Sequence, residues 1–420
     1  MSKKALAEVT TFISRGISPK YGDSGFVVVN QRCIRDNRID FSNARFSSRE
    51  KTRINANKCL RQWDGLVNST GVGTLGRVAQ VIRPADNATA DSHVSIVRPD
   101  ISLLDGRYFG YAMIGVEGYI ETLGTGATGQ TELSRTILSE VEISVHPLPT
   151  QRKIASILSA YDDLIENNLR RIKILEEMAQ ALYREWFVKF RFPGHEKTRM
   201  VDSPLGKVPE GWEVKPLREL TDVITKGTTP TTLGKPFTEE GVNFVKVESV
   251  DNHGAIREEK LAKIDTETHA LLRRSQLAKD DILYSIAGAI GRVTLVPERV
   301  LPANTNQALA IIRSSDPLFV PYLYLNIRSL EFVNFSLGRV VQTAQANVSL
   351  SVLSAAPVAF PPGGLLQLLA NTVGPMLGQI DCLLTKDSNL RRTRDLLLPK
   401  LISGELDVSD LDIKTGGPIQ

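Results

Sequence analysis

The 420-residue chain has few of the residues that build metal centres, disulfide frameworks or nucleophilic active sites. Its three cysteines, Cys33, Cys59 and Cys382, are too far apart for the close pairing of a zinc site, and their low, odd number excludes a disulfide framework. The five histidines are scattered and define no Ser-His-Asp or Cys-His arrangement. We therefore expect neither a metal site nor a catalytic centre of these kinds.

Long apolar runs and a strong net charge are also missing. No stretch approaches the roughly 20 apolar residues of a membrane span, and the start of the chain lacks the apolar core of a secretory signal, so we expect a cytoplasmic protein with no membrane partner. The net charge of +4 permits nucleic-acid binding without requiring it. A hydrophobic content of 42% is typical of a globular protein, and the length predicts two or three domains.

Two long helices are predicted from apolar residues that recur in steps of three and four. The first runs from Pro149 to Arg191 and would extend about 60 Å at 1.5 Å per residue. The second lies in 363–406, where Gly374-Pro375 predicts a kink or a late helix start. We expect an antiparallel pair, although each helix could instead pack only on its own neighbouring domain. The predicted seam and partner-binding residues are Ile154, Tyr161, Ile165, Asn168, Ile172, Leu175, Ile380, Leu383, Leu390 and Leu397, with Asp387 and Arg394 as further polar members.

The chain repeats itself at an offset of about half its length. The matching segments are Leu6–Pro19 with Leu217–Pro230, Asp64–Val78 with Asp281–Val293, Ser95–Arg98 with Ala310–Arg313, and Gln130–Ser139 with Gln345–Ser354. Each copy ends in one of the long helices, so the repeat predicts a pseudo-two-fold arrangement resembling a fused dimer.

The predicted fold is α+β, with two similar globular α/β domains of mainly antiparallel strands separated by the two helices. Short β-rich runs bounded by turn residues occur at Gly25–Asn30, Val242–Val247, Ile282–Ile286 and Ala308–Arg313. The predicted boundaries are 1–148 for the first domain, 149–191 for the first helix, 192–212 for a Pro/Gly-rich connector, 213–362 for the second domain, 363–406 for the second helix and 407–420 for a tail.

Several segments resemble catalytic or cofactor-binding motifs but lack the setting or spacing that those motifs require. The two G-x-G-x-x-G segments, Gly71–Gly76 and Gly124–Gly129, lack the strand-before, helix-after setting of a dinucleotide site and are interpreted as turns. The single Pro-Pro, Pro361-Pro362, is not part of a DNA amino-methyltransferase tetrapeptide. Glu210 and Glu213 are too close together for a nuclease metal site and are interpreted as surface charges.

Basic residues are concentrated in the first domain. From Gln31 to Asp64 there are nine Lys or Arg against four acids, whereas the matching stretch Lys246–Lys279 has seven against six. Such a cluster suits phosphate contacts and guanine edges, although a solvated face would look the same. The candidate DNA-binding residues are Arg32, Arg35, Arg38, Arg45, Arg77, Lys246, Ser249, Asn252, Arg292, Asn306 and Gln307.

Three motifs accompany the repeat: Ala181–Phe187 followed by Phe192-Pro193-Gly194, Val208–Trp212, and Leu390–Leu406. With the repeat, they resemble the specificity subunit of type I restriction-modification systems over almost the whole chain. The resemblance implies two target-recognition domains that each read half of a split double-stranded DNA sequence, and a helix pair that sets the spacing and docks methyltransferase subunits.

The resemblance also implies that the chain is not catalytic and binds no cofactor. S-adenosylmethionine, ATP and Mg would belong to partner subunits, namely two modification subunits and the restriction or motor subunits. The alternatives are a coiled-coil scaffold that binds only proteins and a single-chain enzyme.

Overall fold

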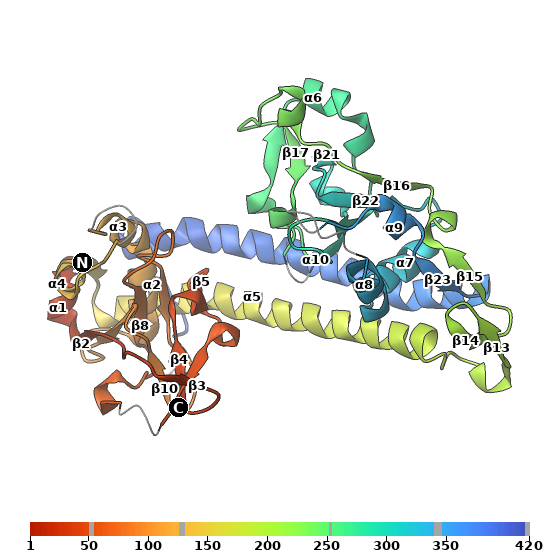
Figure 1. Ribbon diagram of the computed structural model, residues 1–420. Coiled ribbons are helices and arrows are strands. Elements are labelled where there is room, and N and C mark those ends of the chain that lie inside the picture. Colours follow the sequence, from red (N-terminus) through yellow and green to blue (C-terminus); the bar gives the residue numbers. More distant parts are fainter. Residues whose placement is uncertain (50–53, 126–130, 252–253, 340–346, 416–420) are drawn as a thin grey trace. The chain divides into compact units, whose positions relative to one another are not determined.

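The computed structural model describes residues 1–49, 54–125, 131–251, 254–339 and 347–415 (Figure 1). The chain divides into two compact units, which are described separately. The first combines Met1–Glu166 with Asn389–Gln420, and the second is Asn167–Ser388. Each unit therefore holds one copy of the repeat together with part of each long helix.

The first unit contains two four-stranded sheets (Figure 1). One is antiparallel in the order β2-β11-β8-β9, with β2 at Thr10–Arg15, β11 at Val94–Pro99, β8 at Gly65–Asn68 and β9 at Val78–Gln80. The other has the order β10-β4-β7-β3, with β10 at Ala88–Ala90, β4 at Phe26–Val29, β7 at Arg45–Ser47 and β3 at Tyr21–Gly22. In this second sheet β10 and β4 pair in parallel.

The second unit repeats the strand order of the antiparallel sheet, whereas its other sheet has three strands instead of four. Its antiparallel sheet has the order β16-β22-β19-β20, with β16 at Val223–Lys226, β22 at Leu309–Arg313, β19 at Ile282–Ser285 and β20 at Val293–Leu295. Its other sheet has the order β18-β17-β21, with β18 at Ala262–Ile264, β17 at Val242–Val245 and β21 at Ala303–Thr305. The β17–β21 pair is parallel, as is its counterpart in the first unit. The repeat and the mainly antiparallel pairing predicted from the sequence are confirmed.

Shorter elements complete each unit. Two-stranded pairs join β1 (Ser2–Ala5) to β12 (Glu142–Val145), β5 (Ile34–Arg35) to β6 (Arg38–Ile39), β13 (Met200–Ser203) to β14 (Gly206–Pro209), and β15 (Glu213–Pro216) to β23 (Pro357–Phe360). The shorter helices are α1 (Leu6–Val9), α2 (Gly106–Gly115), α3 (Glu117–Thr122), α4 (Arg135–Glu140), α6 (Thr266–Leu271), α7 (Phe319–Ile327), α8 (Leu330–Leu337) and α9 (Leu350–Ser354).

The two long helices differ from their predicted ends. Helix α5 spans Leu148–Tyr183 and is followed by a π-helical turn, Arg184–Val188, so the predicted α-helical end at Arg191 is wrong. Phe190, with φ 56°, adopts a left-handed conformation that an α-helix cannot contain.

Helix α10 spans Gly363–Ile402, so a late start at Gly374-Pro375 is also wrong. The helix forms before Pro375 because Leu366, Leu369 and Val373 are buried in the core of the second unit. Burying three such side chains offsets the amide donor that Pro375 lacks.

Within each unit the two helices run antiparallel and also pack on the globular domain. In the first unit His146 Nε2 lies 3.0 Å from the carbonyl oxygen of Ile402, and Arg394 Nη1 donates to Asp162 Oδ1 at 2.5 Å. In the second unit Asn168 Nδ2 donates to Asp387 Oδ1 at 2.8 Å. Both predicted arrangements, a helix pair and packing on the neighbouring domain, are therefore present.

The predicted seam residues are buried or half-buried in their own units. Ile154, Ile165, Asn168, Ile172 and Leu383 are buried. Tyr161, Leu175, Ile380, Leu390 and Leu397 are half-buried. The three-and-four spacing thus selected positions that are buried or half-buried, including the polar Asn168, and their role in binding a partner stays a prediction.

Candidate nucleic-acid interface

The predicted basic cluster lies on short elements of the first unit. Arg32 is exposed on a 3-10 turn, Gln31–Cys33, and Arg35 is exposed on β5. The β5–β6 hairpin turns through Asp36 and Asn37, whose positive φ values of 49° and 57° are those of the tight turn that suits a two-residue hairpin.

The tip of this hairpin is anchored by a half-buried carboxylate. Asn37 Nδ2 donates to Glu117 Oε2 at 2.5 Å, and the amide of Val78 donates to the same oxygen at 2.9 Å. Burial raises the pKa of Glu117 above its ordinary value, and the hydrogen bond from Val78 opposes that shift. The hairpin that carries Arg35 and Arg38 is therefore held firmly against the rest of the domain.

Arg45 lies on β7 beside exposed aromatic rings. Its guanidinium carbon is 3.4 Å from the centroid of the Tyr21 ring, and Tyr21 and Phe46 are 40% and 44% exposed. Burial of part of the ring raises the pKa of Tyr21. An arginine stacked on an exposed ring presents its fork of donors in a fixed plane, which suits recognition of phosphate or base edges.

Arg38 and Arg77 have other surroundings. Half-buried Arg38 lines a cavity of 450 Å³ in the first unit together with Asp162 and Arg394, so it does not share the open setting of Arg35. Arg77 Nη2 donates to the carbonyl oxygen of Gly73 at 2.9 Å and closes the glycine-rich turn.

The backbone conformation of that turn confirms the interpretation of Gly71–Gly76 as a turn. Gly71, Gly73 and Gly76 have φ values of 105°, 71° and 87°, which favour glycine, and a strand follows them. The second motif, Gly124–Gly129, lies largely outside the described residues.

One candidate in the second unit is wrong. Ser249 is fully buried, and its hydroxyl donates to the carbonyl oxygen of Lys260 at 2.8 Å, so it cannot reach DNA. Arg292 is half-buried, and its Nη1 donates to the carbonyl oxygens of Val247 and Val250 at 3.2 and 2.8 Å. One nitrogen of Arg292 therefore holds a turn, and its contact with DNA stays a prediction.

The remaining candidates of that unit stay predictions. Half-buried Lys246 lies 4.3 Å from the Phe237 ring centroid, and half-buried Asn306 accepts a hydrogen bond from the amide of Ala308. Gln307 is exposed and accepts a hydrogen bond from the hydroxyl of Thr229. Asn252 lies outside the described residues.

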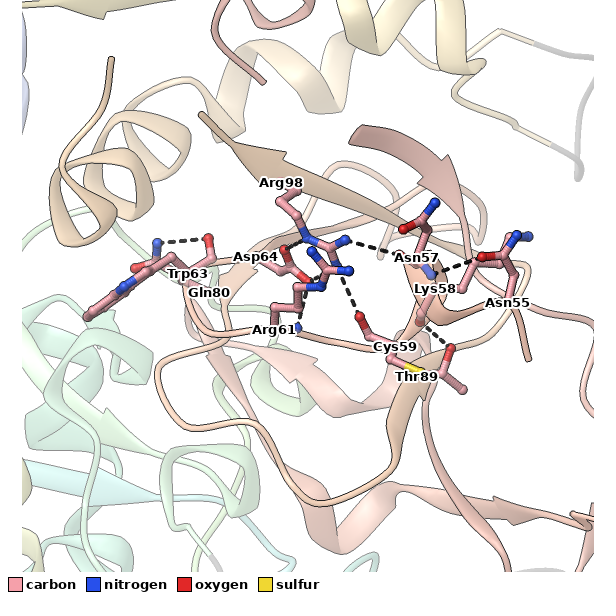
Figure 2. Close-up of polar contacts among 10 residues, drawn as sticks. All are labelled: Asn55, Asn57, Lys58, Cys59, Arg61, Trp63, Asp64, Gln80, Thr89 and Arg98. Carbon is pink, nitrogen blue, oxygen red and sulfur yellow. Dashed lines mark hydrogen bonds and ion pairs between the residues drawn. The ribbon is translucent and has the colours of Figure 1, made fainter. Parts of the chain in front are cut away.

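Sequence reasoning missed a buried ion pair in the first unit (Figure 2). Arg98 donates from Nε and Nη2 to the two carboxylate oxygens of Asp64, both at 2.7 Å. The same guanidinium donates to the carbonyl oxygens of Asn57 and Cys59 at 3.2 and 2.9 Å. A strand residue is thereby joined to the loop that precedes β8.

An equivalent pair occurs in the second unit. Arg313 donates from Nε and Nη2 to Asp281 at 2.6 and 2.7 Å, and from Nη2 to the carbonyl oxygen of Gln276 at 3.1 Å. In the internal repeat Asp64 aligns with Asp281 and Arg98 aligns with Arg313. The recurrence of this aspartate and this arginine in both copies was the sequence signal that could have predicted the ion pair.

The long helices leave apolar side chains exposed. Leu164 is 52% exposed in the first unit, and Ile174 and Met178 are 55% and 49% exposed in the second. Ile174 and Met178 are one helical turn apart and so lie on the same face of α5. This face offers apolar area for a partner protein.

Two further properties bear on the kinds of site present. Among residues 1–49, 54–125, 131–251, 254–339 and 347–415, no group of three His, Cys, Asp or Glu is placed to hold a metal ion. None of the helices in those ranges is both long and apolar enough to cross a membrane.

Known proteins are similar to this chain in sequence. The family described as "Type I restriction modification DNA specificity domain" matches residues 42–177 and 209–364, once in each copy of the repeat. The type I restriction enzyme MjaIX specificity subunit of Methanocaldococcus jannaschii is 28% identical over 83% of this chain and 79% of its own length. The HindI specificity subunit of Haemophilus influenzae is 22% identical over 94% of this chain and 98% of its own.

A solved structure supports the fold. The type I restriction-modification S subunit from M. genitalium is 16% identical, with a TM-score of 0.57 over 96% of both chains. Because the family match covers more than half of the sequence and falls once in each structural repeat, this chain belongs to the type I restriction-modification DNA specificity domain family.

Proposed function

We propose that this chain selects the DNA sequence on which a type I restriction-modification complex acts, with each unit reading one half of a bipartite double-stranded target. The observation that carries the proposal is the duplication: the family match falls once in each copy, and the antiparallel sheets of the two copies have equivalent strand orders. Two copies of one reading domain suit a target made of two separate parts.

The exposed basic side chains of the first unit support contact with DNA. Arg32, Arg35 and Arg45 are exposed, and the guanidinium of Arg45 lies over the Tyr21 ring. Such residues neutralise phosphates and release counterions, which makes affinity depend on salt, and an arginine fork also matches guanine.

We further propose that the exposed apolar side chains of α5, among them Ile174 and Met178, dock modification subunits. Two such subunits, one for each copy of the repeat, would match the duplicated chain, and restriction or motor subunits would join them. In this arrangement S-adenosylmethionine, ATP and Mg belong to the partners, and the present chain contributes recognition without making or breaking bonds. The two long helices set the distance between half-sites.

The test is to measure DNA binding and methyl transfer by the purified chain alone and with its modification subunits. We expect salt-dependent DNA binding, no methyl transfer by the chain alone, and methylation at a split sequence by the complex. Methyl transfer by the isolated chain would contradict the proposal. The absence of salt-dependent DNA affinity would favour a scaffold that binds only proteins.

A further inference from the structure

Two equivalent loops precede the central strands of the two antiparallel sheets. The first, residues 55–64, leads into β8, and the second, residues 272–281, leads into β19. Each begins with one turn of 3-10 helix, Ala56–Lys58 or Arg273–Ser275. Each ends in the aspartate of the buried Asp–Arg pair.

The main-chain hydrogen bonds of the two loops correspond one to one. In the first loop they run from Leu60 N to Ala88 O (2.9 Å), Trp63 N to Val81 O (2.7 Å) and Asp64 N to Arg61 O (3.1 Å); in the second, from Leu277 N to Ala303 O (2.9 Å), Asp280 N to Val296 O (3.0 Å) and Asp281 N to Ala278 O (3.3 Å). The backbone frame is therefore the same in both copies, although the side chains it carries differ.

Both loops also keep an unfavourable backbone conformation at the same position. Trp63 and Asp280 have φ values of 73° and 66°, in the left-handed region that residues other than glycine rarely adopt. A backbone of this kind persists only where surrounding contacts impose it, and it is concentrated at functional sites.

The Asp–Arg pairs supply those contacts. Asp64 Oδ2 accepts the amide of Arg61 at 2.8 Å, and Arg98 donates to the carbonyl oxygen of Cys59 (Figure 2). Asp281 Oδ2 accepts the amide of Ala278 at 2.7 Å. These aspartates and arginines are buried or half-buried, so they position the loops and do not themselves meet a ligand.

The exposed side chains on the 3-10 turns are the part that differs. Position by position, Ala56 and Asn57 of the first turn correspond to Arg273 and Arg274 of the second, and all four residues are exposed. Within the parts of the chain that the structure describes, no hydrogen bond or ion pair occupies the side chain of Asn57, Arg273 or Arg274. These groups are available to a ligand.

The charge of both loops favours a polyanion. Loop 55–64 contains two basic residues and one acid, the buried and paired Asp64. Loop 272–281 contains three basic residues and two acids, the buried and paired Asp281 and the half-buried Asp280. In contrast, residues 246–271 of the second unit contain four basic and six acidic residues. The charged side chains that are exposed on the two loops, Arg61 on the first and Arg273, Arg274 and Lys279 on the second, are therefore all basic.

We propose that loops 55–64 and 272–281 read bases in the DNA major groove, from one shared frame that displays different side chains in the two units. The inference rests on the proposed function and assigns part of its specificity. An asparagine amide pairs through two hydrogen bonds with N6 and N7 of adenine, and an arginine pairs with O6 and N7 of guanine. Asn57 therefore reads an adenine in one half-site, and Arg274 reads a guanine in the other.

The test uses the full complex of the chain with its modification subunits and maps methylated sites across host genomic DNA. Asn57→Ala and Arg274→Ala are compared with the unchanged chain and with Arg135→Ala and Arg218→Ala, which remove exposed arginines outside the loops. Each loop variant should lose about five- to 150-fold of its preference at one base pair of one half-site, while the other half-site keeps its sequence. The two control variants should recognise the unchanged sequence. Because all four side chains are exposed, the melting temperatures should not change.

Three results would overturn the inference. Loop variants that match the controls would show that the loops do not touch DNA. Equal weakening at all sequences would assign the loops to phosphates instead of bases, and altered preference in both half-sites would break the assignment of one loop to one half-site. If the unchanged chain directed no sequence preference at all, the proposed function itself would fail, which separates the two tests.

Discussion

Removing the carboxylate of Asp64 should destabilise the first unit more than the matching change destabilises the second. Asp64→Ala leaves the Arg98 guanidinium, whose side chain is 10% exposed, in a buried site with only carbonyl partners. Breaking a buried ion pair from one side costs about 3–5 kcal/mol. The Arg313 side chain is 34% exposed and can recover water, so Asp281→Ala should cost only about 1.5–3 kcal/mol, the range for hydrogen bonds to charged groups.

The assay is scanning calorimetry of the full-length chain, with hydrogen exchange to assign each transition to a unit. At about 2–4 °C per kcal/mol, Asp64→Ala should lower the melting temperature of the first unit by roughly 6–20 °C, and Asp281→Ala should lower that of the second by roughly 3–12 °C. Asp23→Ala, an exposed position in the first unit, is the matched control and should change the unfolding free energy by less than about 0.5 kcal/mol.

A double variant separates loss of the pair from loss of packing. Asp64→Leu with Arg98→Met replaces the buried charges with apolar groups, which is often neutral or stabilising. Part of the lost stability should therefore return, although the amide of Arg61 and the carbonyl oxygens of Asn57 and Cys59 lose their partners. Equal losses in the two units, or no recovery in the double variant, would refute the argument that the cost comes from an uncompensated buried charge.

Three other changes test separate parts of the account. Glu117→Gln should leave the first unit as stable as the unchanged chain at acidic pH and make it progressively more stable as the pH rises above 4.5, the ordinary pKa of the carboxyl group. The reason is that the pKa of Glu117 is raised in the folded state, so that ionisation of Glu117 favours the unfolded state. Urea unfolding from pH 4 to 7 measures the difference in stability, and a difference that stays constant with pH would contradict this argument. Replacing Ile174 and Met178 with Asp should weaken binding of modification subunits by about tenfold or more in a pull-down titration, and unimpaired assembly would remove α5 as the docking face. Inserting four residues after Glu176 should lengthen α5 by about 6 Å and widen the gap between half-sites by nearly two base pairs, while both half-site sequences stay the same. Methylation mapping that shows an unchanged gap would contradict the role of α5 as a spacer.

The sequence predicted the elements whose signals are local. The strands Gly25–Asn30 and Ala308–Arg313 were found as β4 and β22, because β-rich runs between turn residues depend little on distant contacts. The buried faces of both long helices followed from three-and-four spacing. The duplicated topology followed from internal similarity, which needs no knowledge of how the strands pair.

Features that depend on distant contacts were not predicted. Ser249 was chosen as a polar residue, but its burial is decided by the segment around Lys260 that accepts its hydrogen bond. The end of α5 was placed late because the sequence shows no Pro or Gly before Arg191, whereas a π-helical turn ends the α-helix earlier. The Asp64–Arg98 pair joins a loop to a strand and was visible only through comparison with the second copy.

The most direct test of the central claim is genome-wide mapping of methylated bases in cells that carry the modification subunits with this chain, without it, or with the 42–177 segment replaced by that of another family member. The account predicts a single split motif that disappears without the chain, and a replacement that changes one half-site and leaves the other intact. Methylation that keeps the same motif without the chain, or a replacement that alters neither half-site, would contradict it.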